Sequence, residues 1–336
     1  MAKIAINGFG RIGRSALKVG WGKEGFDVVA INDLTDAKTL AYLLKHDTNY
    51  GLWDVEVVAE GNSLIIAGKK VELLAEKDPA MLPWKKMGID VVIESTGFFT
   101  TQEKAEAHIK AGAKSVVLSA PAKGGDVPTF VLGVNGDGVT SDRHAVINNA
   151  SCTTNCVAPV TAVMEEAFGI EKAIMTTVHG YTASQALVDS PKKDLREGRA
   201  AAENLVPTST GAAIAVTETI PSLKEKFDGL SIRVPISTVS LSDMTFVLKR
   251  DVTIEEVNDA LVKASQSPRF KGILDVSFEP LVSSDYVGNT HSAIVDAELT
   301  NVVAGNLVKV VAWYDNEWGY SNRLVELVLM AAARKL

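Results

Sequence analysis

A glycine-rich turn near the N-terminus constrains the fold of this chain more than any other feature. Residues 3–7 are predicted to form a buried strand, and the sequence Gly-Phe-Gly-Arg-Ile-Gly follows at residues 8–13. Apolar residues recur at helical spacing from Arg11 onward, so the turn should join this strand to a helix. In such a unit the glycines allow a tight turn, close approach of a pyrophosphate and close helix packing. The turn therefore predicts a dinucleotide site at a helix N-terminus.

An acidic residue at a suitable distance supports this interpretation. Residues 27–32 are predicted to form a second strand, and Asp33 follows it, twenty residues after Gly13. In dinucleotide-binding units an acidic side chain at this place accepts hydrogen bonds from ribose hydroxyl groups. A glycine-rich turn alone also occurs in ordinary α/β proteins. The strand, turn, helix and acidic residue together favour dinucleotide binding.

Short apolar strands alternate with helices over the first 150 residues. Further strands are predicted at 89–94, 115–119 and 145–148, and helices at 35–45 and 102–111, the latter with Thr100 and Glu103 as a capping box. This alternation is typical of a doubly wound, mostly parallel sheet, in which ligands bind at the carboxyl ends of strands. Thr96 and Ser119 directly follow two of these strands. On these residues alone, turn formation is favoured over ligand binding.

A cysteine opens a predicted helix that runs to about residue 168. Residues 151–156 read Ser-Cys-Thr-Thr-Asn-Cys, and His179 follows about one strand later. The N–H groups at a helix start carry partial positive charge, so Cys152 is expected to have a lowered pKa and to act as a nucleophile. His179 could pair with it as acid and base. A lone cysteine is more often a small buried apolar residue, so catalysis and core packing both remain open.

The pattern of elements changes after residue 150. Strands are predicted near 230–234, 239–248, 293–298 and 307–314, with segregated helices, one of them capped by Thr253 and Glu256. Residues 183–210 are expected to form a long functional loop. The predicted fold class is α/β. It has an N-terminal doubly wound Rossmann domain (residues 1–150, joined by C-terminal helix 317–336) and an α+β catalytic domain with a mainly antiparallel sheet (residues 151–316).

Length and composition exclude several classes of protein. The 336 residues suggest two domains, and the net charge of −7 disfavours a dedicated nucleic-acid binder. The two cysteines lie four residues apart, and no Cys/His set has zinc-site spacing, so no metal is predicted. No apolar run reaches the ~18 residues of a membrane helix. Because a strand begins within three residues of the N-terminus, no targeting segment is predicted, and a cytoplasmic protein without a membrane partner is expected.

Nine segments, in order along the chain, carry a resemblance to a known family. They are Ile6–Arg14, Ile31–Asp33, Glu94–Gly97, Ser119–Pro121, Ala150–Cys156, Val178–Thr182, Pro207–Ala213, Arg233–Pro235 and Trp313–Ser321. With these segments the chain resembles the phosphorylating glyceraldehyde-3-phosphate dehydrogenases over essentially its whole length. The Ser-Cys-Thr-Thr-Asn-Cys segment is highly specific for that family.

The resemblance implies NAD-dependent oxidation of D-glyceraldehyde 3-phosphate with uptake of inorganic phosphate, giving 1,3-bisphosphoglycerate. Cys152 would attack the aldehyde to form a thiohemiacetal. His179 would stabilise the thiolate and take the hydroxyl proton as hydride passes to nicotinamide. Phosphate would then cleave the resulting thioester. The choice of His179 over the other histidines rests on the resemblance alone; these are His46, His108, His144 and His291.

The resemblance also assigns binding residues. The cofactor would be held by Gly8, Gly10, Arg11, Ile12, Gly13, Asp33, Lys77, Thr96, Ser119 and Asn316, with Asn316 on the nicotinamide carboxamide. Thr182 and Arg233 would hold the substrate phosphate, and the attacking phosphate would be held by Ser151, Thr153, Thr210 and Gly211, with Arg199 nearby. Asp33 repels a 2′-phosphate, so NAD is expected over NADP. Ser190 stands where strict NAD relatives often carry leucine, which suggests residual NADP use.

A homotetramer is implied as well, with the long loop packing between subunits. Two other interpretations remain open. An erythrose-4-phosphate dehydrogenase would share the cysteine, the histidine and the fold, and would differ in the phosphate-binding segments. A redox-sensing protein on the same scaffold would keep the reactive thiol without catalysing a reaction.

Overall fold

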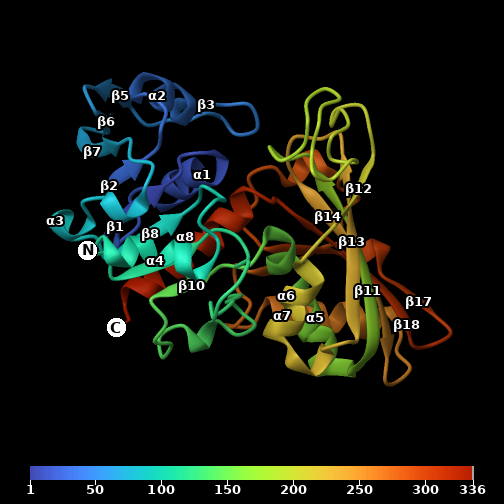
Figure 1. Cartoon of the computed structure of the whole chain (residues 1–336). Coiled ribbons are helices and arrows are strands. Elements are labelled where there is room, and N and C mark those ends of the chain that lie inside the picture. The colour runs from blue at the N-terminus through green and yellow to red at the C-terminus, as the bar shows by residue number, and fades with distance from the viewer. Residues whose placement is uncertain (335–336) are drawn as a thin grey trace. The chain divides into compact units, whose positions relative to one another are not determined.

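The computed structural model describes residues 1–334, and their contacts separate into two compact units (Figure 1). Unit 1 comprises Met1–Phe130, Gly136–Ala150 and the chain from Ser321 onward, and unit 2 comprises Val131–Asn135 and Ser151–Tyr320. Each unit contains one eight-stranded sheet. Residues 335–336, at the end of the predicted last helix, lie outside the described residues.

The sheet of unit 1 is doubly wound and mostly parallel, as predicted. Its strand order is β10-β9-β8-β1-β2-β7-β6-β5. The parallel strands are β1 (Ala2–Asn7), β2 (Phe26–Asn32), β7 (Lys69–Leu74), β8 (Val91–Glu94), β9 (Ser115–Leu118) and β10 (Val146–Asn148). The sequence reading missed β7 and the antiparallel edge, which is formed by β5 (Val57–Glu60) and β6 (Ser63–Ile66).

The helices of unit 1 are α1 (Arg11–Gly20), α2 (Ala37–Lys45), α3 (Trp84–Met87), α4 (Gln102–Lys110) and α8 (Trp318–Ala332), which belongs to this unit from Ser321. Two of these helices, α2 and α4, begin at capping side chains. The short strands β3 (His46–Asp47) and β4 (Gly51–Leu52) pair with each other. The predicted Thr100 cap of α4 is wrong. Thr101 caps the helix by accepting from the Lys104 N–H, whereas Thr100 is buried.

Four parallel strands of unit 1 end level with one another. Asn7 at the end of β1 pairs in register with Asn32 of β2 and with Glu94 of β8. Glu94 in turn pairs with Leu118 of β9. Because parallel strands share one carboxyl edge, the residues that follow them gather at that edge, where ligands of such sheets bind. The predicted cofactor residues Gly8, Asp33, Thr96 and Ser119 all lie there.

The buried carboxylate of Glu94 links several residues at this edge through hydrogen bonds. Glu94 accepts at Oε2 from Asn7 Nδ2 (2.6 Å) and from His108 Nε2 (3.0 Å). Its Oε1 accepts from the Thr96 N–H (2.8 Å) and from the Thr96 hydroxyl. Trp84 Nε1 donates to His108 Nδ1 (2.9 Å), which leaves the imidazole proton on Nε2. The carboxylate therefore has four donors, as a buried charge requires.

The sheet of unit 2 is mainly antiparallel, as predicted, in the order β12-β13-β11-β14-β18-β16-β15 with β17 on β18. Within the described residues of this sheet, only the pairs β11–β13 and β15–β16 are parallel. The strands are β11 (Ile170–Gly180), β12 (Val206–Ser209), β13 (Phe227–Val234), β14 (Ser240–Leu248), β15 (Leu274–Ser277), β16 (Ala293–Asp296), β17 (Asn301–Val303) and β18 (Leu307–Tyr314).

Three helices complete unit 2: α5 (Cys152–Phe168), α6 (Ala212–Thr219) and α7 (Ile254–Ser265). They lie together beside the sheet in Figure 1, and α5 contacts both other helices and the strands β11, β14, β16 and β18. The predicted capping box of Thr253 and Glu256 at α7 is confirmed. Short 3₁₀ turns occupy Pro79–Met81, Gly136–Gly138, Pro221–Leu223, Ser283–Tyr286 and Ala297–Leu299.

The predicted loop at 183–210 is shorter than expected, because Val206–Ser209 pairs antiparallel with β13. An isolated parallel bridge also joins Ala186 to Ala200. No helix formed by residues 1–334 has the length and apolar character needed to cross a membrane.

The hydrogen bond from Trp84 to His108 generates a stability prediction. Trp84→Phe keeps an aromatic ring but removes the donor to the buried His108 Nδ1. We expect a loss of about 1–3 kcal/mol from the unsatisfied acceptor, in addition to the packing loss. Chemical denaturation measures this change in the free energy of unfolding. Trp21→Phe, at a half-buried position, is the control. Equal stability of the Trp84 variant and wild type would contradict the prediction.

Candidate active site

Cys152 is the first residue of α5, and the local chain holds it there. Ser151 is the N-cap residue, and its Oγ accepts from the Thr154 N–H (2.9 Å). Ala150 has a left-handed backbone (φ 53°), which is uncommon for a residue with a side chain. A hydrogen bond from its N–H to Asn148 Oδ1 (2.9 Å) stabilises this turn. The strained residue lies directly before the Ser-Cys pair, as is common beside functional groups.

His179 faces this thiol from the end of β11. The Cys152 Sγ lies 3.4 Å from His179 Nε2. His179 Nδ1 lies 2.7 Å from the Gly180 carbonyl oxygen, which can only accept, so Nδ1 carries the proton of the neutral ring. Nε2 is then the acceptor that faces the thiol. The structure thus brings the two predicted catalytic residues together in the geometry of a nucleophile and its base.

Burial opposes charge on either partner alone. It raises the pKa of the Cys152 thiol, while Arg233 and hydrogen bonds from Thr153 act in the lowering direction. Burial lowers the pKa of His179 to about 3, Arg233 adds to this effect, and the Gly180 carbonyl opposes it. The predicted lowering of the thiol pKa by the helix start is therefore outweighed by desolvation. A proton transferred from Sγ to Nε2 would place the two opposite charges side by side, where each would stabilise the other.

A chain of hydroxyl groups lies beside the histidine. Thr177 Oγ1 donates to the Leu241 carbonyl (3.3 Å), so Tyr314 donates its proton to Thr177 (2.8 Å) and accepts from Thr153 Oγ1 (2.9 Å). The Tyr314 ring packs edge-on against His179, with centroids 6.1 Å apart. Burial raises the pKa of Tyr314, which keeps its hydroxyl neutral. These contacts fix the first turn of α5 and the imidazole relative to each other.

Arg233 provides positive charge at this site. It pairs in register with His179 on the adjacent strand β13, and its charge acts on both catalytic residues. Its Nε is buried and has no hydrogen-bond partner within residues 1–334. A buried guanidinium nitrogen without a partner is the kind of donor that an anionic ligand completes. Thr182 follows β11 and is half-buried, with its Oγ1 3.0 Å from Ser184 Oγ.

The other residues predicted to bind phosphate differ in their hydrogen-bond partners and exposure. Gly211 is the N-cap residue of α6, and Thr210 Oγ1 accepts from the Ala212 N–H (3.1 Å). The Ser151 and Thr153 hydroxyls bond to Thr154 and Tyr314. Arg199 is exposed, and its Nε donates to Asp189 Oδ2 (3.0 Å). The structure does not join Arg199 to these residues through any hydrogen bond within residues 1–334.

The start of α1 in unit 1 fits a dinucleotide phosphate. Gly8 has a left-handed backbone, and a Cβ there would lie 2.7 Å from Thr96 N, while a Cβ on Gly13 would lie 2.3 Å from Gly8 O. Gly10, the N-cap residue, would meet nothing within 4 Å and has no side-chain cap. The close contacts and the open helix end together form a cradle for an anion.

The remaining cofactor residues of unit 1 are placed as follows. Asp33 accepts from the Phe9 and Thr35 N–H groups (2.8 and 2.9 Å), which fixes its carboxylate beside the turn. Arg11 forms an ion pair with Asp47 (2.6 Å), and the Thr96 hydroxyl bonds to Glu94. Ile12 and Ser119 are half-buried, and Lys77 is exposed.

Asn316 lies in unit 2, two residues after Tyr314. Its side chain is buried, and Oδ1 accepts from Ser240 Oγ (3.0 Å). Sequence reasoning missed Ser240, because one small polar residue among several inward-facing residues of β14 gives no signal. It also missed Asp315, whose carboxylate accepts from the Glu317 and Trp318 N–H groups (3.0 and 2.8 Å). Its position inside the segment Trp313–Ser321 could have identified Asp315 from the sequence.

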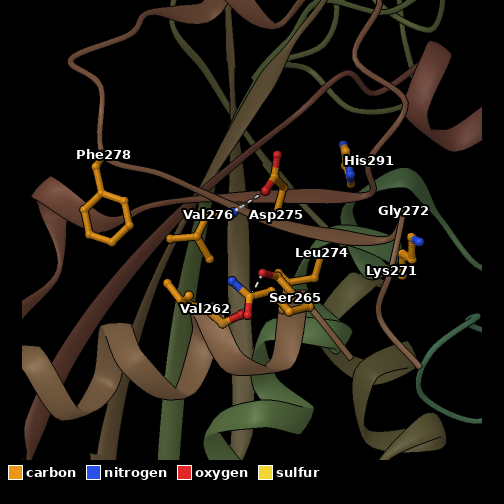
Figure 2. Close-up of a pocket in the computed structure, with 10 residues that line it drawn as sticks. Val262, Ser265, Lys271, Gly272, Leu274, Asp275, Val276, Phe278 and His291 are labelled. Atoms are coloured by element: carbon orange, nitrogen blue, oxygen red, sulfur yellow. Dashed lines mark hydrogen bonds between the residues drawn. The ribbon is translucent and has the colours of Figure 1, made fainter. Parts of the chain in front are cut away.

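A separate pocket of about 580 Å³ lies between α7 and β15 of unit 2 (Figure 2). Ser265, Lys271, Asp275 and His291 are among the side chains that line it. None of the predicted site residues lines this pocket, and it contains neither cysteine. It is therefore distinct from the Cys152–His179 site.

These observations define a class of protein: a nucleotide-binding α/β unit joined to a unit in which a cysteine thiol lies against a histidine. Comparison with known families agrees. Residues 2–102 match the model for the glyceraldehyde 3-phosphate dehydrogenase NAD binding domain, and residues 151–316 match the model for the C-terminal domain of the same enzyme. The chain belongs to the glyceraldehyde-3-phosphate dehydrogenase family.

Curated relatives match over nearly the whole chain. The glyceraldehyde-3-phosphate dehydrogenase of Priestia megaterium is 53% identical over 334 residues, covering 99% of both chains. Glyceraldehyde-3-phosphate dehydrogenase 2 of Bacillus subtilis is 53% identical, covering 99% of this chain and 97% of its own. The Borreliella burgdorferi enzyme of the same name is 51% identical, covering 97% and 98%.

The charge of Arg233 generates a prediction on thiol reactivity. Arg233→Met removes the cation that lowers the thiol pKa, so the pH profile of Cys152 alkylation by iodoacetamide should move to higher pH. Arg233→Lys keeps the charge, and its profile should stay near that of wild type. The measurement is the rate of Cys152 labelling against pH, followed by mass spectrometry. A profile of the Met variant that is unchanged or moves to lower pH would contradict this account.

Proposed function

We propose that this chain is an NAD-dependent phosphorylating glyceraldehyde-3-phosphate dehydrogenase that acts through Cys152. The observation that carries the proposal is the part-buried Sγ–Nε2 contact of 3.4 Å at the start of α5, beside Arg233. The family and its relatives, which bear this enzyme's name, support it. They also disfavour the erythrose 4-phosphate alternative.

The proposed first step uses the proton positions found at the site. Cys152 Sγ forms a bond to the aldehyde carbon of D-glyceraldehyde 3-phosphate as its proton moves to His179 Nε2. The same proton then passes to the aldehyde oxygen, which becomes the hydroxyl of a thiohemiacetal. Because Nδ1 donates to Gly180, Nε2 is free to accept and return the proton.

Oxidation and phosphate transfer complete the reaction. NAD, when bound, supplies the acceptor for the hydride that leaves the thiohemiacetal carbon. His179 takes the hydroxyl proton in this step, so a thioester forms on Cys152. An oxygen of inorganic phosphate then attacks the thioester carbon, the C–S bond breaks, and the thiolate leaves beside protonated His179. Holding the acyl group as a thioester divides one difficult conversion into two easier ones.

The phosphate-binding roles extend the proposal. Thr182 and Arg233 hold the substrate phosphate, which is supported by the buried Arg233 Nε, an atom without a hydrogen-bond partner within residues 1–334. Ser151, Thr153, Thr210 and Gly211 hold the attacking phosphate, at the starts of α5 and α6, where helix N–H groups favour anions. Arg199 assists there only after it leaves Asp189.

The cofactor is NAD, and the residues of each unit have separate proposed roles. In unit 1, the start of α1 with Gly8, Gly10, Arg11, Ile12 and Gly13 holds the pyrophosphate, Asp33 binds the adenosine ribose, and Lys77, Thr96 and Ser119 contact the adenosine region. In unit 2, Asn316 binds the nicotinamide carboxamide. These roles follow a proposed division into a dinucleotide-binding domain (1–150, joined by the C-terminal helix) and a catalytic domain (151–316).

A homotetramer in the cytoplasm is also proposed. The long loop of unit 2 exposes large apolar side chains, among them Leu187 (82% exposed) and Leu195 (84%). Apolar side chains gathered on one exposed loop indicate a surface that another subunit covers.

The activity generates the first prediction of this subsection. With NAD⁺ and D-glyceraldehyde 3-phosphate, absorbance at the NADH band should rise continuously only when inorganic phosphate is present; without phosphate it should stop after at most one NADH per Cys152. Cys152→Ala should lower the rate by about 10⁴-fold or more, because the nucleophile is lost. Cys156→Ala, one helical turn further along α5, is the matched control and should stay active.

Two further substrates complete the assay. NADP should give a lower kcat/KM than NAD because Asp33 repels its 2′-phosphate, with residual use through Ser190. A kcat/KM that is higher with erythrose 4-phosphate than with D-glyceraldehyde 3-phosphate would favour the alternative substrate. Absence of turnover by the folded wild-type protein would count against the proposed function.

The exposed loop generates a prediction on assembly. Sedimentation should give four times the mass of one chain for the wild-type protein. Leu187→Asp places a charge in the proposed interface and should shift the protein to smaller species. Met81→Asp changes an equally accessible apolar residue of unit 1 (70% exposed) and should leave the tetramer intact. A wild-type monomer would refute the assembly.

A further inference from the structure

One buried serine connects the histidine strand to Asn316. Ser240 begins β14 and is 1% exposed. Its Oγ accepts from the Gly180 N–H (3.2 Å) and contacts Asn316 Oδ1 (3.0 Å). We infer that Ser240 is a positioning residue that sets the orientation of the Asn316 amide, so that Nδ2 is presented to the carboxamide oxygen of nicotinamide. The inference rests on the proposed function, since it needs NAD as the ligand.

Proton counting determines the amide orientation. The Gly180 N–H can only donate, so Ser240 Oγ accepts there and its single proton goes to Asn316 Oδ1. With the amide turned by 180°, Oγ would face two N–H donors, and its own proton would lack an acceptor. Within residues 1–334 the hydroxyl has only these two partners. An unmade hydrogen bond at a buried hydroxyl is costly, which selects the orientation that is present.

The other end of the amide is then available to a ligand. Asn316 is buried, and within the described chain no group accepts from its Nδ2. This nitrogen is not fully buried, so it is accessible to an acceptor from solvent or from a bound molecule. A carboxamide oxygen is such an acceptor. A flipped Asn316 would present Oδ1 and would bind the carboxamide through its nitrogen, which requires either the carboxamide group or the whole nicotinamide ring to turn by 180°.

The backbone around Ser240 holds its hydroxyl group in this position. Val239 has a left-handed backbone (φ 69°) although it is β-branched and buried against Tyr286 and Ile294. Such strain persists only where the surroundings fix it. The preceding residues supply that fixation: Thr238 Oγ1 donates to Asp315 Oδ1 (3.3 Å), and the Tyr181 N–H donates to the Ile236 carbonyl (3.0 Å). A Cβ on Gly180 would lie only 3.0 Å from that carbonyl oxygen.

Calorimetric binding separates this role from a general structural one. The probes are NAD⁺ and ADP-ribose, which lacks nicotinamide and its carboxamide. Ser240→Ala should raise the Kd for NAD⁺ by about tenfold and leave the Kd for ADP-ribose within about twofold. Ser240→Thr restores the hydroxyl and should recover most of the NAD⁺ affinity.

Ser242→Ala is the matched control. Ser242 is buried two residues along the same face of β14 and, in the described chain, bonds to neither Gly180 nor Asn316. Both affinities should stay at the wild-type level in this variant. A second readout uses NAD⁺ carrying deuterium at C4. Wild-type protein should place the hydride on one face, and Ser240→Ala should give a measurable fraction on the other.

The outcomes distinguish the inference from the proposed function. Unchanged NAD⁺ affinity and single-face transfer in Ser240→Ala would overturn the inference. Equal weakening of NAD⁺ and ADP-ribose would overturn it too, because it would indicate damage to the fold. Failure of the wild-type protein to bind either probe would overturn the proposed function, and the inference with it.

Discussion

The part-buried contact between Cys152 Sγ and His179 Nε2 is the interaction on which the proposed chemistry of unit 2 depends. Burial penalises a charge on either group alone, so the thiol becomes reactive only where the imidazole receives its proton. That requirement needs a fixed tautomer, which the Gly180 carbonyl supplies, and a fixed helix start, which Ser151 supplies. Arg233 then adds charge from the neighbouring strand.

In unit 1 the constraint is steric: the backbone of the glycine turn must leave room for the proposed anion. The glycines permit the close approach, and the level strand ends bring Gly8, Thr96 and Asp33 to one edge. The buried Glu94 holds that edge through Asn7, His108 and the Thr96 N–H. The Thr96 hydroxyl donates to Glu94, so the proposed contact of Thr96 with a ligand would come from its backbone or methyl group.

Much of this was predictable, because local signals were strong. The sheet classes of both units, the capping box of α7 and the family agree with the sequence interpretation. The predictions that failed were local choices between neighbours or effects of burial. Thr101 rather than Thr100 caps α4, and β12 forms where a loop was expected. Desolvation, which no local pattern reveals, raises the pKa of Cys152.

The sequence by itself determined the glycine turn, the acidic residue after the second strand and the cysteine at a helix start, because each depends on spacing within a few residues or one supersecondary unit. Only the tertiary structure decided which partners these residues meet. Cys152 and His179 are 27 positions apart, and Ser240 and Asn316 are 76 apart. Their contacts depend on the registers of β11, β13, β14 and β18. Strand register is a collective property of packing, which no single stretch of sequence specifies.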